Sequence, residues 1–473
     1  MWIPLLFRLF IFFGLLLFTL SSSSQSVFEG PPVFHHPDAI GHYPHTPFLY
    51  RIPVSGKQPV SIQVSGMPEG MELHSPRGIL TMTDPPAGDV ILNIIAKNDE
   101  GTTTSTLRLQ FGEQLCLTPP LGWNSWNFFA SDVSESIIMA MADAMDTNGM
   151  AHTGWQYINI DDYWQADTRL PDGTPQADSI RFPHGIAWLA DYVHARGLKL
   201  GIYSCAGRMT CGRQFGGYQY EEMDANTYAR WGVDLLKYDY CFVPNNRQEA
   251  VTRYTKMGKA LRQSGRSIVY SICEWGFQKP WEWAEKAGGH YYRTTWDIFD
   301  QWRGNGILHG VLSIVKKQNK LSDYSRPGHF NDPDMLLLGN YGRGKATSFK
   351  GLMKGLTEQQ YATHFALWCF FNAPLLSSAD LRSLSDETRN LLTNASLLRV
   401  NQDALGKQAV CIRKEKGCML FEKTMKSNQI AYLWVNTRRQ SRSVRHPVTQ
   451  QKRVLPGYGY ETYSLTITEN RYR

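Results

Sequence analysis

The stretch Leu-Leu-Lys-Tyr-Asp-Tyr-Cys (residues 235–241) is a short apolar and aromatic run that ends in a carboxylate. Its length and its large apolar side chains predict a β-strand. Apolar residues recur at helical spacing on both sides of this run, over Asp224–Trp231 and Glu249–Gln263. A strand between two helices is the repeating unit of a parallel α/β fold.

Units of this kind repeat along the chain from Pro119 onward. Strand-like and helical runs alternate, and two further helices are predicted over Ser134–Asn148 and Ile186–Arg196. Eight strand–helix units in succession predict an α/β protein with a (β/α)8 TIM barrel over residues 116–399. The candidate strands are Leu121–Trp126, Tyr157–Asp162, Leu198–Ser204, Leu235–Tyr240, Ile268–Cys273, Tyr291–Trp296, His329–Met335 and Phe371–Leu375.

Two β-rich regions flank the predicted barrel. Residues 25–115 contain short alternating segments separated by Gly, Pro, Asn and Asp, a pattern that predicts an all-β domain and resembles a small immunoglobulin-like sandwich. This domain could bind carbohydrate or only position the barrel. Residues 400–473 predict a C-terminal antiparallel β domain that depends on packing against the barrel for its stability. The candidate strands are Val60–Val64, Gly78–Met82, Val90–Ala96, Thr103–Phe111, Ala409–Arg413, Cys418–Glu422, Ile430–Val435 and Tyr460–Ile467.

The N-terminus has the pattern of a secretory signal peptide over residues 1–24. Arg8 precedes the apolar run Leu9–Leu20, and the small residues Ser21–Ser24 follow it. The run is short for a membrane span, although an uncleaved anchor is the alternative interpretation. We therefore expect an exported protein, periplasmic or extracellular, with no membrane contact beyond this segment.

Composition argues against several classes of partner. The net charge is +7 with scattered basic residues and no nucleic-acid motif, so no nucleic-acid partner is expected. Eight cysteines are too few for a disulfide scaffold, but export permits one or two bridges. The sequence has no Cys-x-x-Cys pair or His-rich cluster, so we expect neither a metal site nor another cofactor. The 14 Trp and 23 Tyr fit either core packing or stacking on sugar rings, and a homo-oligomer is one option that the sequence leaves open.

Carboxylates gather at the predicted carboxyl ends of the strands, which is where barrel active sites are built. Asp239 ends one strand and Asp297 closes another, Tyr-Tyr-Arg-Thr-Thr-Trp-Asp (291–297). Two such carboxylates could serve a glycosidase as nucleophile and proton donor. Lys237 alternates to the same face as Asp239 and would favour its ionised form, although a structural salt bridge is the alternative interpretation. Further carboxylates follow other strands, where helix caps or turns could also explain them: Asp161, Asp162 and Asp334.

At these residues the chain resembles family 27 of the glycoside hydrolases, the α-galactosidase family. The resemblance covers roughly residues 117–410 in order. It implies the barrel fold, an exo-acting retaining hydrolase and no cofactor. The matching stretches are Pro-Pro-Leu-Gly-Trp-Asn-Ser-Trp (119–126), Ile-Asp-Asp-Tyr-Trp (160–164), Arg-Phe-Pro-His-Gly-Ile (181–186), Gly-Leu-Lys-Leu-Gly-Ile-Tyr-Ser (197–204), Trp-Gly-Val-Asp-Leu-Leu-Lys-Tyr-Asp (231–239), Cys-Glu-Trp (273–275), Asn-Asp-Pro-Asp-Met-Leu (331–336) and Asn-Gln-Asp-Ala-Leu-Gly (401–406).

The resemblance also implies roles for individual residues. Asp239 would be the nucleophile, and Asp297 the general acid and then the base that activates water. Retention requires these two carboxyls to be about 5–5.5 Å apart. Asp161 and Asp162 would accept hydrogen bonds from the 4- and 6-hydroxyls of the sugar. The other implied site residues are Trp126, which would stack on the sugar, then Tyr203, Lys237, Arg293 and Asp334, which would complete the pocket, and the disulfide pair Cys211 and Cys241.

Specificity is read from two positions. Glu274 lies in the region that faces the sugar 2-position in this family, and its bulk suits a free 2-hydroxyl rather than an acetamido group. Both members of the Asp161–Asp162 pair are retained, which favours galactose over β-L-arabinopyranose. The expected partner is therefore an α-galactoside oligosaccharide or glycan. The alternatives are a β-L-arabinopyranosidase or an α-N-acetylgalactosaminidase on the same barrel, or a catalytically silent sugar-binding protein.

Overall fold

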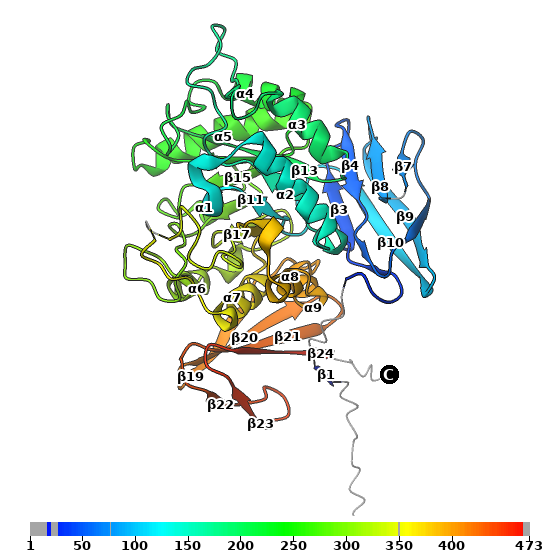
Figure 1. The fold of residues 1–473 in the computed structure, drawn as a ribbon, viewed down its shortest axis with the longest axis vertical. Coiled ribbons are helices and arrows are strands. Elements are labelled where there is room, and N and C mark those ends of the chain that lie inside the picture. Colours follow the sequence, from blue (N-terminus) through cyan, green and yellow to red (C-terminus); the bar gives the residue numbers. More distant parts are fainter. Residues whose placement is uncertain (1–16, 20–26, 76, 349–350, 467–473) are drawn as a thin grey trace, which may run out of the picture.

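The computed structural model describes residues 17–19, 27–75, 77–348 and 351–466. A barrel of strands and helices forms the centre of the molecule (Figure 1), with the N-terminal β domain against one side and the C-terminal sheet below the last barrel helices. The predicted signal peptide lies largely outside the described residues. The part of it that is described, β1 (Leu17–Thr19), pairs antiparallel with β24 (Tyr460–Thr466).

The predicted barrel is confirmed as eight parallel strands in one sheet. Strands that follow one another along the chain are paired from β11 to β17, and β18 pairs with β11, so that the sheet order is β17-β16-β15-β14-β13-β12-β11-β18. The two outer strands are joined by a parallel bridge between Leu336 and Ser377, just beyond β17. The strands are β11 (Leu121–Asn124), β12 (Tyr157–Asn159), β13 (Lys199–Cys205), β14 (Leu235–Asp239), β15 (Val269–Cys273), β16 (Tyr291–Arg293), β17 (Phe330–Asp332) and β18 (Leu375–Ser377).

Helices lie between most of the strands, and several begin at polar caps that the sequence supplies. The side chain of Ser134 accepts a hydrogen bond from the Ile137 amide at the start of α2, and Asn246 does the same for Glu249 in α5. The helices are α1 (Trp126–Phe129), α2 (Glu135–Thr147), α3 (Gly185–His194), α4 (Glu221–Arg230), α5 (Arg247–Gln263), α6 (Val311–Gln318), α7 (Glu358–Phe370), α8 (Asp386–Leu392) and α9 (Ala395–Asn401).

The eighth predicted strand was wrong. The run from Phe371 that we expected to be a strand is a turn that directly follows α7, which ends at Phe370, and β18 begins only at Leu375. Helix α7 is buried on all sides between the barrel and the C-terminal sheet, so its last turns carry an aromatic run with no polar face. The helix stops where Asn372 adopts a left-handed conformation with φ of 51°. The connection from β15 to β16 also differs from a full strand–helix unit, because it contains only the 3-10 turn η3 (Pro280–Glu282).

The N-terminal domain covers the end of the barrel at which the strands begin. Tyr43 and Leu115 pack in one buried cluster with the first residues of five barrel strands. The backbone amide of Tyr43 donates a hydrogen bond to Ser267 Oγ at 3.0 Å, and Arg51 forms an ion pair with Asp146 of α2. The amino ends of the strands are therefore covered, and the carboxyl ends are left for a site.

The N-terminal domain itself is built from β-sheets around a separate apolar core. A four-stranded sheet runs in the order β3-β10-β9-β6, and a three-stranded sheet runs β4-β8-β7. Its likeness to an immunoglobulin domain stays a prediction. The strands are β2 (Val33–Phe34), β3 (Ala39–His42), β4 (Phe48–Arg51), β5 (Val54–Ser55), β6 (Ser61–Ser65), β7 (Glu72–His74), β8 (Ile79–Met82), β9 (Gly88–Asn98) and β10 (Gly101–Phe111).

The C-terminal domain is the expected antiparallel sheet, in the order β1-β24-β21-β20-β19. Alternation along β21 sends Leu433 and Val435 into the barrel core, while Tyr432 and Trp434 face a second cluster under the β22–β23 hairpin. No described helix combines the length and the hydropathy that a bilayer crossing needs. The remaining strands are β19 (Val410–Glu415), β20 (Cys418–Met425), β21 (Gln429–Asn436), β22 (Arg442–Arg445) and β23 (Lys452–Leu455).

Candidate active site

Side chains at the carboxyl ends of the barrel strands enclose a cavity of about 550 Å³, including its open mouth. A second cavity, of about 620 Å³ including its open mouth, lies between the N-terminal domain and the amino ends of the barrel strands, but none of the described residues that line it is a carboxylate. Most of the predicted site residues line the first cavity: Trp126, Asp161, Tyr203, Cys211, Lys237, Asp239, Arg293, Asp297 and Asp334.

Asp239 is the last residue of β14 and is only 5% exposed. Its Oδ2 accepts a hydrogen bond from the Tyr203 hydroxyl at 2.9 Å, and its Oδ1 accepts one from the Tyr240 amide at 2.9 Å. Burial raises the pKa of Asp239 to about 6, although Lys237 acts to lower it. The two hydrogen bonds orient the carboxylate, and the cation alone does not offset the cost of burying it.

Asp297 has a different environment from Asp239. It follows β16 by four residues, and its side chain is 47% exposed. Arg293, at the end of β16, donates a hydrogen bond from Nη2 to Asp297 Oδ1 at 2.9 Å, and the same nitrogen lies 3.0 Å from Oδ2 of the buried Asp334. Burial raises the pKa of Asp334, while Arg293 acts against it. One guanidinium thus serves two carboxylates of the cavity wall.

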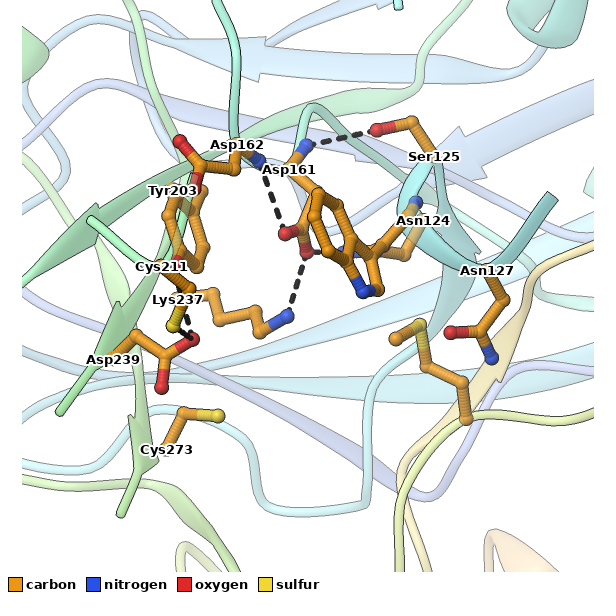
Figure 2. Close-up of polar contacts among 12 residues, drawn as sticks. Asn124, Ser125, Asn127, Asp161, Asp162, Tyr203, Cys211, Lys237, Asp239 and Cys273 are labelled. Atoms are coloured by element: carbon orange, nitrogen blue, oxygen red, sulfur yellow. Dashed lines mark hydrogen bonds and ion pairs between the residues drawn. The ribbon is translucent and has the colours of Figure 1, made fainter. Parts of the chain in front are cut away.

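Lys237 and Asp161, which both line the cavity, form an ion pair (Figure 2), with Nζ 2.7 Å from Oδ2. Burial lowers the pKa of Lys237, but Asp161 beside it more than compensates and raises the pKa above its ordinary value. Asn124 donates a second hydrogen bond to the same Asp161 oxygen at 2.9 Å, and Ser125 Oγ accepts one from the Asp161 amide. The end of β11 therefore holds the carboxylate that follows β12.

Asp162 lies behind this pair rather than in the cavity lining. Its Oδ2 accepts a hydrogen bond from the Gly212 amide at 2.7 Å, and its Oδ1 accepts one from the Tyr163 amide. Burial raises the pKa of Asp162 to about 6. Gly212 is next to Cys211, which is bonded to Cys241 as the resemblance implied. Asp162 thus anchors the loop that the disulfide ties to the residues after β14.

Glu274, the first residue after β15, is fully buried and does not line the cavity. Its Oε2 accepts a hydrogen bond from the Gln278 amide at 2.7 Å, while its Oε1 has no hydrogen-bond partner among the described residues. Burial raises its pKa to about 8. The carboxyl group braces the turn 274–278, and it is the following residue, Trp275, that reaches the cavity.

Backbone strain gathers at the strand ends. Tyr163, Trp275 and Asp334 all have positive φ values, of 72°, 60° and 83°, each within two residues of a predicted site residue or at one. Such conformations persist where the surrounding structure enforces them, and they concentrate at functional sites. Trp126, at the start of α1, stacks parallel to Tyr163 with ring centroids 6.3 Å apart.

Several residues of the site were not predicted from the sequence. Asn124 and Ser125 could have been found, because they are polar residues at the end of a predicted strand. Ala346 and Thr347 come from the long loop before α7 and carry no signal of this kind. The other unpredicted lining residues are Asn127, Cys273, Trp275, Ile298, Phe299 and Met335.

This arrangement can carry out a displacement at a sugar carbon. Asp239 offers a buried carboxylate held by Tyr203, and Asp297 offers a solvent-accessible carboxyl at the mouth. The polar wall, with Asp161, Lys237 and Arg293, can hydrogen-bond hydroxyls, and Trp126 supplies an aromatic face. Two carboxyl groups in unlike environments are what glycoside hydrolysis requires.

Comparison with known proteins agrees with this geometry. A family model described as alpha galactosidase A matches residues 118–403. The α-galactosidase A of Cellvibrio japonicus is 44% identical over 329 residues, which cover 68% of this chain and 77% of the relative. Human α-galactosidase A is 38% identical over 338 residues, covering 68% of this chain and 75% of the relative.

Solved structures extend the likeness beyond the barrel. A Bacteroides fragilis protein provisionally assigned as an α-galactosidase is 41% identical with a TM-score of 0.89, and the match covers 94% of this chain and 100% of that one. The α-galactosidase I of Mortierella vinacea is 28% identical with a TM-score of 0.68, covering 74% of this chain and 97% of that one.

Proposed function

Because the chain belongs to the α-galactosidase family, glycoside hydrolase family 27, we propose that it is a retaining α-galactosidase that removes terminal α-D-galactosyl residues by double displacement. The observation that carries this proposal is the pair of carboxylates in one cavity, Asp239 buried against Tyr203 and Asp297 at the mouth beside Arg293. Relatives named as α-galactosidases support the choice of sugar.

In the first step, Asp239 attacks the anomeric carbon and forms a covalent glycosyl-enzyme while Asp297 protonates the departing oxygen. Tyr203 and the Tyr240 amide hold the attacking carboxylate in place. Once Asp297 has given up its proton, the hydrogen bond from Arg293 stabilises the carboxylate that remains.

In the second step, Asp297 takes a proton from a water molecule whose oxygen attacks the anomeric carbon. The bond from that carbon to Asp239 breaks, and the sugar leaves with its original configuration. The solvent exposure of Asp297 suits a group that donates one proton to the leaving oxygen and then takes one from an incoming water molecule. A separation of about 5–5.5 Å between the two carboxyls is predicted for this mechanism.

Galactose recognition is assigned to other residues of the cavity lining. Asp161, fixed by Lys237 and Asn124, accepts a hydrogen bond from a sugar hydroxyl, and Trp126 stacks on the ring. A carboxylate offers about four acceptor positions, so the two backbone amides that bind Asp162 leave positions free, and its contact with a second hydroxyl stays a prediction because the side chain lies behind the cavity lining. We retain export as a proposal on the strength of the N-terminal pattern.

The experiment is hydrolysis of matched aryl glycosides: the α-D-galactopyranoside, the β-L-arabinopyranoside and the α-N-acetylgalactosaminide, with Asp239→Ala as the control. The proposal predicts that the galactoside is fastest and that the variant is inactive on all three. A faster arabinoside would keep the mechanism but contradict the sugar assignment. No hydrolysis of any of them would support a sugar-binding protein instead.

A further inference from the structure

Three aromatic side chains form a continuous group that begins at the cavity lining, which we call the aromatic rim: Trp275, Phe277 and Trp296. The ring centroids of Trp275 and Trp296 are 4.8 Å apart. Phe277 stacks on Trp296 with centroids 5.4 Å apart and an angle of 20° between the planes. Phe277 is nevertheless 54% exposed, so much of its ring faces solvent.

The aromatic rim is continuous with the catalytic cavity. Trp275 belongs both to the cavity lining and to the rim. Trp296 immediately precedes Asp297, the residue assigned to protonate the leaving oxygen. A leaving group must lie next to the acid that protonates it, and the rim shares a chain segment with that acid and a side chain with the cavity lining, which favours a leaving group that departs toward the rim.

The turn that carries Phe277 is braced. Glu274 accepts a hydrogen bond from the Gln278 amide at 2.7 Å, and the Trp283 indole donates one to the Gln278 carbonyl at 2.9 Å. Trp275 adopts a left-handed backbone conformation with φ of 60°. An exposed aromatic ring on a strained and hydrogen-bonded turn is held in a fixed position, which lowers the entropic cost of binding a ligand there.

We propose that the aromatic rim binds the leaving-group sugar, so that the preferred substrates are galactosides linked to another pyranose ring. This inference rests on the proposed function and deepens it. The ring of Phe277 offers a flat apolar surface that matches the C–H face of a pyranose, and Trp296 supports that surface from behind. Galactose itself is held by the inner wall and does not need the rim.

The test compares two substrates that share galactose and differ in the leaving group: an α-(1→6)-linked galactosyl-glucose disaccharide and α-galactosyl fluoride. Fluoride has no ring to stack. Phe277→Ala should lower kcat/KM for the disaccharide about 3- to 10-fold, the range expected for one aromatic contact, and leave α-galactosyl fluoride within about twofold. Phe277→Tyr keeps the ring face and should behave like the unmodified protein.

Two further variants complete the design. Phe277→Leu keeps apolar bulk in the turn but not a flat face, so it should show the same selective loss even if the alanine variant does not fold. Trp188→Ala removes a partly exposed aromatic ring from the outer face of α3 and should change neither substrate.

The outcomes separate the two levels of inference. If neither substrate is hydrolysed by the unmodified protein, the proposed function fails. If both are hydrolysed and the Phe277 variants lose nothing, or lose both substrates equally, the binding of a leaving-group sugar at the rim is wrong while the function stands.

Discussion

Replacing Lys237 with Met should destabilise the barrel strongly, because it leaves Asp161 buried without its cation. Lys237 Nζ and Asp161 Oδ2 are 2.7 Å apart. The Lys237 side chain is only 14% exposed and that of Asp161 only 2%. Removing one partner of a buried ion pair costs about 3–5 kcal/mol, since the remaining charge has lost both water and its partner. Asn124 alone then holds Asp161 Oδ2.

The expected decrease in Tm can be calculated from the size of the domain. Unfolding entropy is about 2.1 cal/mol/K per residue, so a barrel of roughly 280 residues gains about 0.6 kcal/mol/K on unfolding. A loss of about 4 kcal/mol therefore lowers Tm by about 7 °C. The assay is thermal unfolding at pH 7, followed by circular dichroism and by calorimetry.

Two controls isolate the ion pair. Lys345→Met removes a cation from an exposed pair with Asp132 and should change stability by less than about 1 kcal/mol. Asp161→Asn combined with Lys237→Met removes both charges and should recover most of the loss. The reasoning is refuted if Lys237→Met costs less than about 1 kcal/mol, or if the double variant is no more stable than the single one.

Three further predictions concern the carboxyl groups of the site. Burial raises the pKa of Asp239 to about 6, so kcat/KM for an α-galactoside should fall about tenfold per unit below pH 6 as the nucleophile is protonated; a pH–rate profile that stays flat to pH 4 would contradict this. Asp297→Ala should lower kcat/KM about 10²- to 10⁴-fold for a galactoside with a sugar leaving group. The loss of kcat/KM for α-galactosyl fluoride should be far smaller, because fluoride leaves with little help from an acid. Equal losses for the two substrates would argue against the acid role. Burial raises the pKa of Glu274 from 4.5 to about 8, so ionising it opposes folding: the folded protein binds this proton more tightly, and stability falls between pH 4.5 and 8. Glu274→Gln should therefore be more stable than the unmodified protein at pH 9, by up to about 5 kcal/mol, and should lose that advantage at pH 5. Urea unfolding at the two pH values measures the difference in stability. The same difference at both pH values would show that ionisation of Glu274 is not the cause.

Much of the barrel could be predicted because its strands are short, apolar and bounded by polar residues. The run before Asp239 is such a strand, and β14 spans Leu235–Asp239. The pattern failed at Phe371, the residue after α7, because the buried last turns of that helix have no polar face and their aromatic run continues into the following turn. The docking of Tyr43 against the amino ends of the strands also had no signal, since a single aromatic residue in a β-rich region gives no hint of its distant partners.

The candidate site was predictable where chemistry resides in the residue type and less so where it depends on side-chain direction. Asp161 and Arg293 lie where polar strand ends suggested. The orientation of Glu274 could not be foreseen, because its hydrogen bond to Gln278 turns the carboxyl group into its own loop and brings Trp275 to the cavity. Thr347 reaches the site from a loop whose course depends on tertiary packing.

The central claim is that Asp239 forms a covalent bond to galactose during the reaction. A slow fluorinated α-galactoside with a good leaving group should trap that intermediate, and peptide mass spectrometry would locate the added sugar. We predict one equivalent of sugar on the peptide that contains Asp239, and none in the Asp239→Ala variant. Labelling at another carboxylate, or hydrolysis with inversion and no trapped species, would contradict the account.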